Sequence, residues 1–216
     1  MKIYMIIDDE ILIFHALRYS DDQLIVEGLA RNYGRISFVV RISHAPRAKV
    51  RHVIFQPMAV LEVQWEEKTR AKLMRPIAAR VSQPWSSLHT SPIKAAITLF
   101  LAEFLLQVCR HEQSGELFFD YLLHSLTWLD TAEEGFANFH LLFLMRLAQF
   151  LGIAPNTSDT GLPFFDLMAA EFVSRAPAHA YYIYGDEARA FEQLLRMNFS
   201  TMHLFQLTRT QRNRIL

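Results

Sequence analysis

The first 80 or so residues contain five short runs rich in Ile, Val, Leu and Phe, and this pattern constrains the fold more than any other feature of the chain. Polar turns separate the runs, and in the fourth run Glu62 and Gln64 alternate with apolar neighbours. Both features are typical of β-strands. Five strands in so short a stretch predict a small closed barrel of the OB-fold type, because closure removes exposed sheet edges. The predicted strands span residues 11–17, 24–29, 36–42, 58–65 and 73–81.

A polar segment with two prolines, residues 83–92, separates this region from a helical second half. From Ile93 to Val108 apolar residues recur in steps of three and four, which predicts a core-facing helix capped by Ser91. Further helices are expected at about 116–129, 134–151 and 186–197 and after Ser200, with loop, short strands or turns at 164–184. The sequence thus predicts an α+β chain with an OB-fold β-barrel domain at 1–82 and an all-α helical domain at 83–216.

The end of the sequence carries a helix-start signal. Thr208 and Gln211 have the spacing of a capping box, yet the sequence stops at Leu216 after barely two turns. Isolated helices of that length are marginal, so we expect the natural protein to continue beyond this residue.

Composition restricts the compartment and the cofactors. The chain has one cysteine, Cys109, which excludes an intramolecular disulfide and a four-cysteine zinc site. Asp8, Asp9 and Glu10 interrupt the region where a signal peptide would need an apolar run, and the apolar stretch 95–109 is too short to span a membrane. We therefore expect a cytoplasmic protein with no membrane segment, no cofactor and no bound metal.

The sequence carries no recognisable signature of catalysis. It has no Gly-rich phosphate loop, no Gly-x-Ser-x-Gly elbow, no His-Glu-x-x-His motif and no dinucleotide fingerprint. His111, Glu112 and Glu116 come nearest to a metal set, but their loose spacing favours a solvated helix end. Cys109 is interpreted as a buried structural thiol. We expect a protein that is not an enzyme.

Positive charge is concentrated in residues 31–80, although the whole chain is neutral. This stretch has eleven Lys and Arg against three Glu, an excess of eight. Such clustering can neutralise phosphates, and OB-folds often combine it with aromatic side chains on which bases stack. The available candidates are Tyr33, Phe38, Phe55 and Trp65, and the sequence does not say which of them point outward. The residues predicted to bind nucleic acid are Arg31, Arg35, Arg41, Arg47, Lys49, Arg51, Lys68, Arg70, Lys72 and Arg75.

Several ordered segments resemble one known family, the bacterial recombination mediator RecO, and its Bacteroidetes-type branch most of all. Together they cover nearly the whole chain. The matching segments are Tyr19–Val26, Tyr33–Val40, Gln56–Met58, Ser91–Ile97, Phe100–Leu105, Trp128–Asp130, Asn138–Leu141, Leu151–Asn156 and Thr208–Asn213. The chain departs from the family pattern in two places: many members carry a four-cysteine zinc motif that is missing here, and residues 41–46 stand where a glycine and several basic residues are usual.

The resemblance implies a non-catalytic role in DNA repair and recombination after DNA damage. It implies binding of single- and double-stranded DNA, annealing of complementary strands, and assistance with RecR to RecA loading on DNA coated by single-stranded-DNA-binding protein (SSB). It also implies that the helical domain binds the acidic, hydrophobic C-terminal tail of SSB, for which the candidate cations are Arg146, Arg175, Arg189 and Arg196. The alternative is an OB-fold protein-interaction scaffold without direct DNA binding.

Overall fold

The computed structural model describes residues 5–43, 45, 48–67, 73–109 and 115–216. The chain divides into two compact units, which we call the first unit (Met1–Thr131) and the second unit (Ala132–Leu216). The first unit thus continues past residue 82 and includes the first two helices of the second half.

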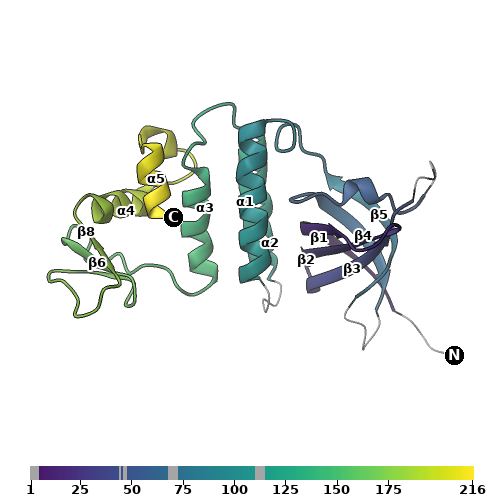
Figure 1. The fold of residues 1–216 in the computed structure, drawn as a ribbon, viewed down its shortest axis with the longest axis horizontal. Helices are drawn as coiled ribbons and strands as arrows, with labels where there is room; N and C mark the ends of the chain where they lie inside the picture. The colour runs from purple at the N-terminus through teal and green to yellow at the C-terminus, as the bar shows by residue number, and fades with distance from the viewer. Residues whose placement is uncertain (1–4, 44, 46–47, 68–72, 110–114) are drawn as a thin grey trace. The chain divides into compact units, whose positions relative to one another are not determined.

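The first unit is built on an antiparallel sheet of five strands, which confirms the strand expectation (Figure 1). Every neighbouring pair in the order β3-β2-β1-β4-β5 is antiparallel. The strands are β1 (Ile6–Arg18), β2 (Gln23–Ala30), β3 (Gly34–Arg41), β4 (Val60–Glu66) and β5 (Pro76–Gln83), and a short 3-10 helix, η1 (His52–Ile54), lies between β3 and β4.

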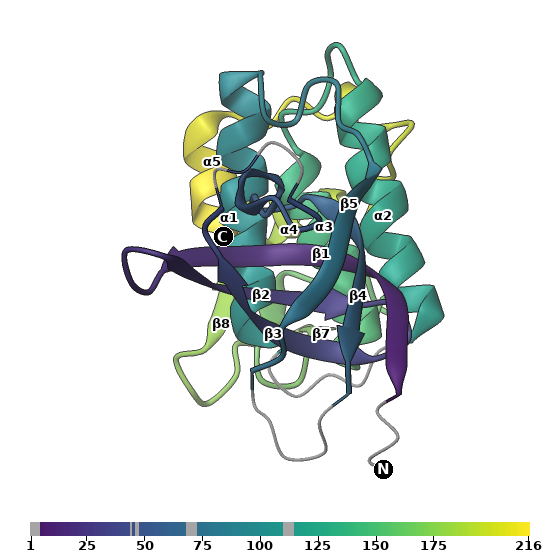
Figure 2. The same ribbon diagram turned by 90° about the vertical axis from the view of Figure 1, so that its right-hand side faces the viewer.

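The sheet is not closed into a barrel, although its two edge strands meet at one point. In Figure 2, β1 and β2 run across the view and β5 runs down it, so the sheet curls strongly. A parallel bridge joins Phe38 of β3 to Met74, just before β5. The Val39 amide donates to the Met74 carbonyl at 2.8 Å, and the Met74 amide donates to the Ser37 carbonyl at 2.9 Å. Curling and this bridge take the place of the continuous closure expected from the sequence.

The middle of strand β1, Ile11–Phe14, is buried on both faces, which explains why these four consecutive residues are apolar. Ile11 and Ile13 belong to the core inside the curled sheet, together with Phe38 and Trp65. Leu12 and Phe14, which alternate with them along the strand, are equally buried. Helix α1 (Pro92–Val108) packs against β1. The hydrophobic effect therefore holds the sheet and the first helix together as one unit.

The connection between the sheet and α1 is fixed by a buried carboxylate. Asp130, near the end of α2 (Glu116–Thr131), accepts hydrogen bonds from the backbone amides of Ser86, Ser87 and Leu88 at 2.7–2.9 Å. The Lys94 ammonium donates to the Asp130 carbonyl at 2.9 Å. Burial alone would raise the pKa of Asp130, but these amide bonds and the Ser86 hydroxyl outweigh it and lower the pKa to about 2.

The second unit contains the remaining expected helices and a small antiparallel sheet of order β7-β6-β8. The expectation of helices is confirmed, and 164–184 forms short strands, so the description as all-α needs this addition. Thr208 and Gln211 form the expected capping box, with the Gln211 amide donating to Thr208 Oγ1 at 3.2 Å. The elements are α3 (Phe139–Phe150), β6 (Phe164–Asp166), β7 (Glu171–Val173), β8 (Tyr182–Tyr184), α4 (Asp186–Arg196), η2 (Met202–Leu204) and α5 (Arg209–Ile215).

No helix among the described residues combines the length and the apolar composition needed to cross a membrane.

Replacing Asp130 by Ala is expected to lower the free energy of unfolding by about 3 kcal/mol at neutral pH, because the backbone amides of Ser86, Ser87 and Leu88 lose their acceptor. The pKa of Asp130 is lower in the folded chain, about 2, than its ordinary value of 3.8. Its ionised form therefore stabilises the fold fully above about pH 4, and this contribution is lost as pH falls through about 2. Urea unfolding at several pH values measures the difference between wild type and variant, which should shrink on acidification.

Asp21→Ala is the matched control, because Asp21 is exposed in the β1–β2 turn of the same unit. Equal losses of stability in Asp130→Ala and Asp21→Ala would contradict the role given to Asp130.

Candidate functional site

The ten cations predicted to bind nucleic acid fall into three groups in the structure. Arg47, Lys68, Arg70 and Lys72 lie outside the described residues. Arg31 and Arg35 are paired with carboxylates inside the first unit. The side chains of Arg41, Lys49, Arg51 and Arg75 are exposed, and none of them forms a salt bridge within the described part of the chain.

Arg31 holds the sheet to helix α2. Its guanidinium bonds Glu10 of β1 at 3.0 Å, also bonds Asp120 of α2, and lies 4.5 Å from the centre of the Phe119 ring. Burial alone would lower the pKa of Arg31, but the hydrogen bonds to Asp120 and Glu10 outweigh burial and raise it. With two carboxylate partners, Arg31 is poorly placed to neutralise a phosphate.

Arg35 and Arg80 are also occupied by carboxylates of the sheet. Arg35 bonds Glu27 on the neighbouring strand at 3.2 Å, and its guanidinium lies over the Phe14 ring. Arg80, which was counted in the charge excess, bonds Glu62. Like charges directly opposite each other in a sheet destabilise it, and Glu62 lies opposite Glu10 across β4 and β1. Arg31 and Arg80 neutralise this pair of carboxylates.

The acidic residues near the N-terminus lie within β1, and Asp9 shapes the turn between β2 and β3. Asp9, which is buried, accepts hydrogen bonds from the backbone amides of Asn32 and Tyr33 at 2.8 and 3.0 Å. Its other oxygen accepts from the Asn32 side-chain amide at 2.9 Å. These bonds satisfy the turn between β2 and β3, so the role of Asp9 is structural.

Two of the exposed arginines border one hollow on the sheet. Arg41 ends β3, and Gln23 lies directly opposite it on β2. Arg75 is brought close by the hydrogen bond from the Val39 amide to the Met74 carbonyl. Together with Asp22 and Val39 these residues line a hollow of about 260 Å³. It lies on the β2–β3 face beside the β1–β2 turn, which is where OB-folds bind oligonucleotides.

The other two exposed cations lie in the segment directly before η1. Lys49 and Arg51 are exposed, and the Ala79 amide of β5 donates to the Lys49 carbonyl at 3.2 Å. This bond holds the Lys49 backbone beside β5.

Three of the four aromatic side chains that the sequence offered as candidates for base stacking lie in the core. Phe38, Phe55 and Trp65 are buried, and Tyr33 packs its ring edge-on against Trp65 at 5.5 Å. Tyr19, in the β1–β2 turn, is 71% exposed. The sequence signal for Tyr19 was its place in a polar turn, where few neighbours can cover an aromatic ring.

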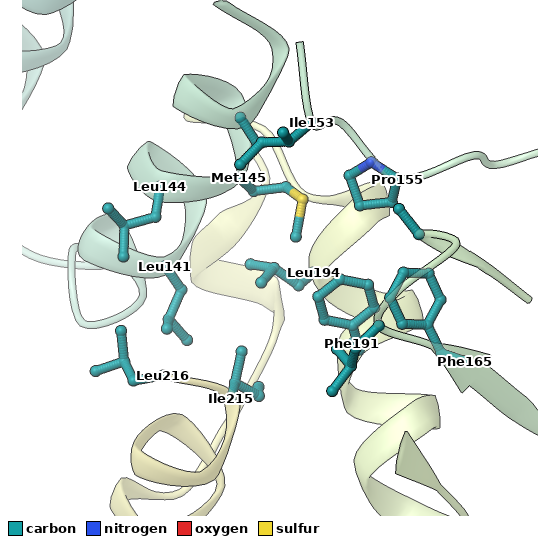
Figure 3. Close-up of a pocket in the computed structure, with 13 residues that line it drawn as sticks. Leu141, Leu144, Met145, Ile153, Pro155, Phe165, Phe191, Leu194, Ile215 and Leu216 are labelled. Carbon is teal, nitrogen blue, oxygen red and sulfur yellow. The ribbon is translucent and has the colours of Figure 1, made fainter. Parts of the chain in front are cut away.

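The second unit contains an apolar hollow of about 260 Å³ (Figure 3). Its walls come from α3, the loop that follows it, the small sheet, α4 and the end of α5. Figure 3 shows Met145, Leu194 and the rings of Phe165 and Phe191 directed toward one another around it. All thirteen lining residues are apolar: Leu141, Leu144, Met145, Ala148, Ile153, Pro155, Phe165, Leu167, Ala170, Phe191, Leu194, Ile215 and Leu216.

Of the four arginines expected to bind a partner, Arg146 alone lies beside this hollow. It lines a smaller hollow of about 60 Å³ that shares Met145, Pro155 and Leu194 with the larger one. Arg189 and Arg196 bond Asp186 and Glu192 on their own helix. Arg175 is exposed and, like Arg189 and Arg196, lines neither hollow.

The remaining sequence candidates do not form a site in the part of the chain that the structure describes. Cys109 is buried at the end of α1, as expected of a structural thiol. His111 and Glu112 lie outside the described residues, and Glu116 begins α2. No group of three or more His, Cys, Asp or Glu side chains that could hold a metal ion occurs among the residues described.

Comparisons with known proteins agree with the resemblance seen in the sequence. Residues 5–84 match the family model described as the N terminal of recombination protein O, and residues 89–216 match the model described as its C terminal. The chain belongs to the RecO family. By sequence α1 and α2 thus fall within the C-terminal family region, whereas by packing they belong to the first unit.

Curated RecO proteins resemble the chain along almost its full length. The DNA repair protein RecO of Bacteroides fragilis is 44% identical over 207 residues, which cover 95% of this chain and 86% of the relative. The corresponding protein of Phocaeicola vulgatus is 41% identical over the same coverage. That of Christiangramia forsetii is 32% identical over 98% of this chain and 88% of the relative. This RecO-family chain is therefore a DNA repair protein.

Arg31→Ala is expected to reduce the free energy of unfolding by about 2 kcal/mol, because it leaves Glu10 and Asp120 without their cation and removes the contact with Phe119. Arg41→Ala should cost less than about 0.5 kcal/mol, since its side chain is exposed. Urea unfolding of both variants measures the contrast. An Arg31→Ala protein as stable as Arg41→Ala would show that Arg31 has no structural role.

Proposed function

We propose that this chain is a non-catalytic, DNA-binding recombination mediator that works without a cofactor. It binds single- and double-stranded DNA, anneals complementary strands, and helps RecA, together with RecR, to load on SSB-coated DNA in the nucleoid region of the cytoplasm. The observation that carries the proposal is the hollow on the β2–β3 face, which is bordered by Arg41 and Arg75. Family membership supports the DNA repair role.

The physical basis of the binding is phosphate neutralisation. Each phosphate contact releases condensed counterions, so the logarithm of the affinity falls linearly with the logarithm of the salt concentration. Arg41, Lys49, Arg51 and Arg75 are suited to such contacts because their charges are not already neutralised by carboxylates among the described residues. Phosphate contacts carry no base information, so little sequence preference is expected.

The scaffold alternative rests on the same face binding a protein. The scaffold role does not require DNA binding, whereas the mediator role does. A protein that bound no DNA at low salt would favour the scaffold.

The partner proposal concerns the apolar hollow of the second unit. An acidic, hydrophobic peptide tail needs an apolar pocket for its side chains and a nearby cation for its carboxylates. The thirteen apolar residues of the hollow supply the first, and Arg146 beside it supplies the second. We propose that the C-terminal tail of SSB binds here.

The double variant Arg41→Ala, Arg75→Ala should weaken binding to unrelated DNA sequences about equally. Two lost phosphate contacts should also reduce the slope of log affinity against log salt by roughly 1.4 for single strands and roughly 1.8 for duplex. Fluorescence anisotropy over a range of salt concentrations measures both effects.

Arg80→Ala is the control for this measurement, because Arg80 lies in the same basic region but bonds Glu62. Its slope should equal that of the wild type. The proposed face would be wrong if the double variant kept the wild-type affinity and slope.

Arg146→Glu should weaken binding of an acidic, hydrophobic tail peptide by about tenfold or more, because a carboxylate then faces the peptide's own carboxylates. Arg175→Glu makes the same charge change away from the hollow and should leave the affinity within about twofold. Isothermal titration calorimetry with the peptide compares the two. Equal losses, or none, would place the peptide elsewhere.

A further inference from the structure

The hollow between β2, β3 and the start of β5 contains a negative charge among its positive ones. Asp22 lines it together with Arg41 and Arg75, and Gln23 and Val39 complete the lining. No salt bridge between the described residues joins Asp22 to either arginine across the hollow. A site built for phosphate alone would exclude a carboxylate, because like charges repel at this range. The lining therefore needs a ligand that can satisfy both kinds of group.

The hydrogen-bonding groups of the lining match a nucleotide. An ionised carboxylate only accepts, a guanidinium only donates, and the Gln23 amide does both. The exposed edge of an unpaired base presents donors and acceptors side by side, and its phosphate carries the negative charge. We propose that this hollow holds one unpaired nucleotide, with the base edge against Asp22 and Gln23 and the phosphate against Arg41 and Arg75. The proposal rests on the DNA binding proposed above.

The volume of the hollow agrees with a ligand as small as one nucleotide. Pockets for drug-sized ligands occupy roughly 300 to 1,000 Å³. At about 260 Å³ this hollow is slightly smaller, which suits a single nucleotide better than a longer segment.

The hollow is preorganised by backbone hydrogen bonds. The Ile42 amide donates to the Asp22 carbonyl at 2.7 Å, which fixes the β1–β2 turn to the end of β3. The Ser20 hydroxyl donates to Asp22 Oδ1 at 2.9 Å and orients the carboxylate. The Val39–Met74 bond fixes the backbone next to Arg75. Groups held in place before binding lose less entropy when the ligand arrives.

A consequence follows for the choice between single strands and duplex. In a duplex the pairing edges of the bases are occupied, and extruding a base costs a few kcal/mol. A duplex can therefore reach Arg41 and Arg75 with a phosphate, but it cannot bring a pairing edge to Asp22. The hollow should favour single strands, which phosphate contacts by themselves do not.

Asp22→Asn tests the proposal through the sign of its effect. Removing a negative charge near bound DNA ordinarily strengthens binding to any polyanion. If Asp22 accepts a hydrogen bond from a base, the same change should weaken single-strand binding by roughly tenfold, while duplex affinity stays unchanged or rises. Anisotropy with a mixed-sequence oligonucleotide, alone and annealed to its complement, measures both. The asparagine oxygen can still accept from Ser20, and thermal unfolding checks that the fold is kept.

Asp21→Asn is the control, since it makes the same charge change in the same turn at a residue that does not line the hollow. Both DNA forms should bind it as well as the wild type or slightly better. Loss of single-strand affinity in Asp22→Asn alone would support the proposal. Equal changes for single strand and duplex in Asp22→Asn, or no change, would overturn it. A wild-type protein that binds neither form would instead refute the proposed function itself.

Discussion

The arrangement of the first unit depends on the interactions of Glu10, which lies in the central strand β1. The Glu10 carboxylate accepts hydrogen bonds from Arg31 and from Ser82 of β5. Arg31 also donates to Asp120 of α2. The backbone carbonyl of Glu10 accepts from the Arg31 amide at 2.8 Å. One carboxylate thus connects the end of β2, the edge strand β5 and a helix. Because Glu10 also lies opposite Glu62, the sheet needs cations of its own.

This requirement separates the cations of the basic region into two groups. Arg31, Arg35 and Arg80 neutralise carboxylates of the sheet and α2, so the positive charge they add to the sequence is already balanced in the fold. Arg41 and Arg75 line a hollow, and neither forms a salt bridge within the described residues. Counting charges along the sequence therefore overstates the number of cations whose charge is available to a ligand.

The local patterns of the sequence predicted the elements well. The five apolar runs became the five strands, and the capping box at Thr208 formed as expected. Local patterns could not say which face of a strand points inward, because alternation leaves the two faces equivalent until long-range pairing is known. Phe38 and Trp65 were thus candidates for base stacking, whereas both lie in the core. The apolar hollow of the second unit could not be predicted either, because its walls come from several separate segments.

The most direct test of the division between structural and ligand-binding cations is hydrogen–deuterium exchange of the backbone amides with and without a single-stranded oligonucleotide. The account predicts slower exchange at residues 22–23, 39–42 and 74–75, which surround the hollow, and no change at Arg31 or at Phe119 and Asp120 of α2. Protection centred on Arg31 and α2, with none around Arg41 and Arg75, would contradict it.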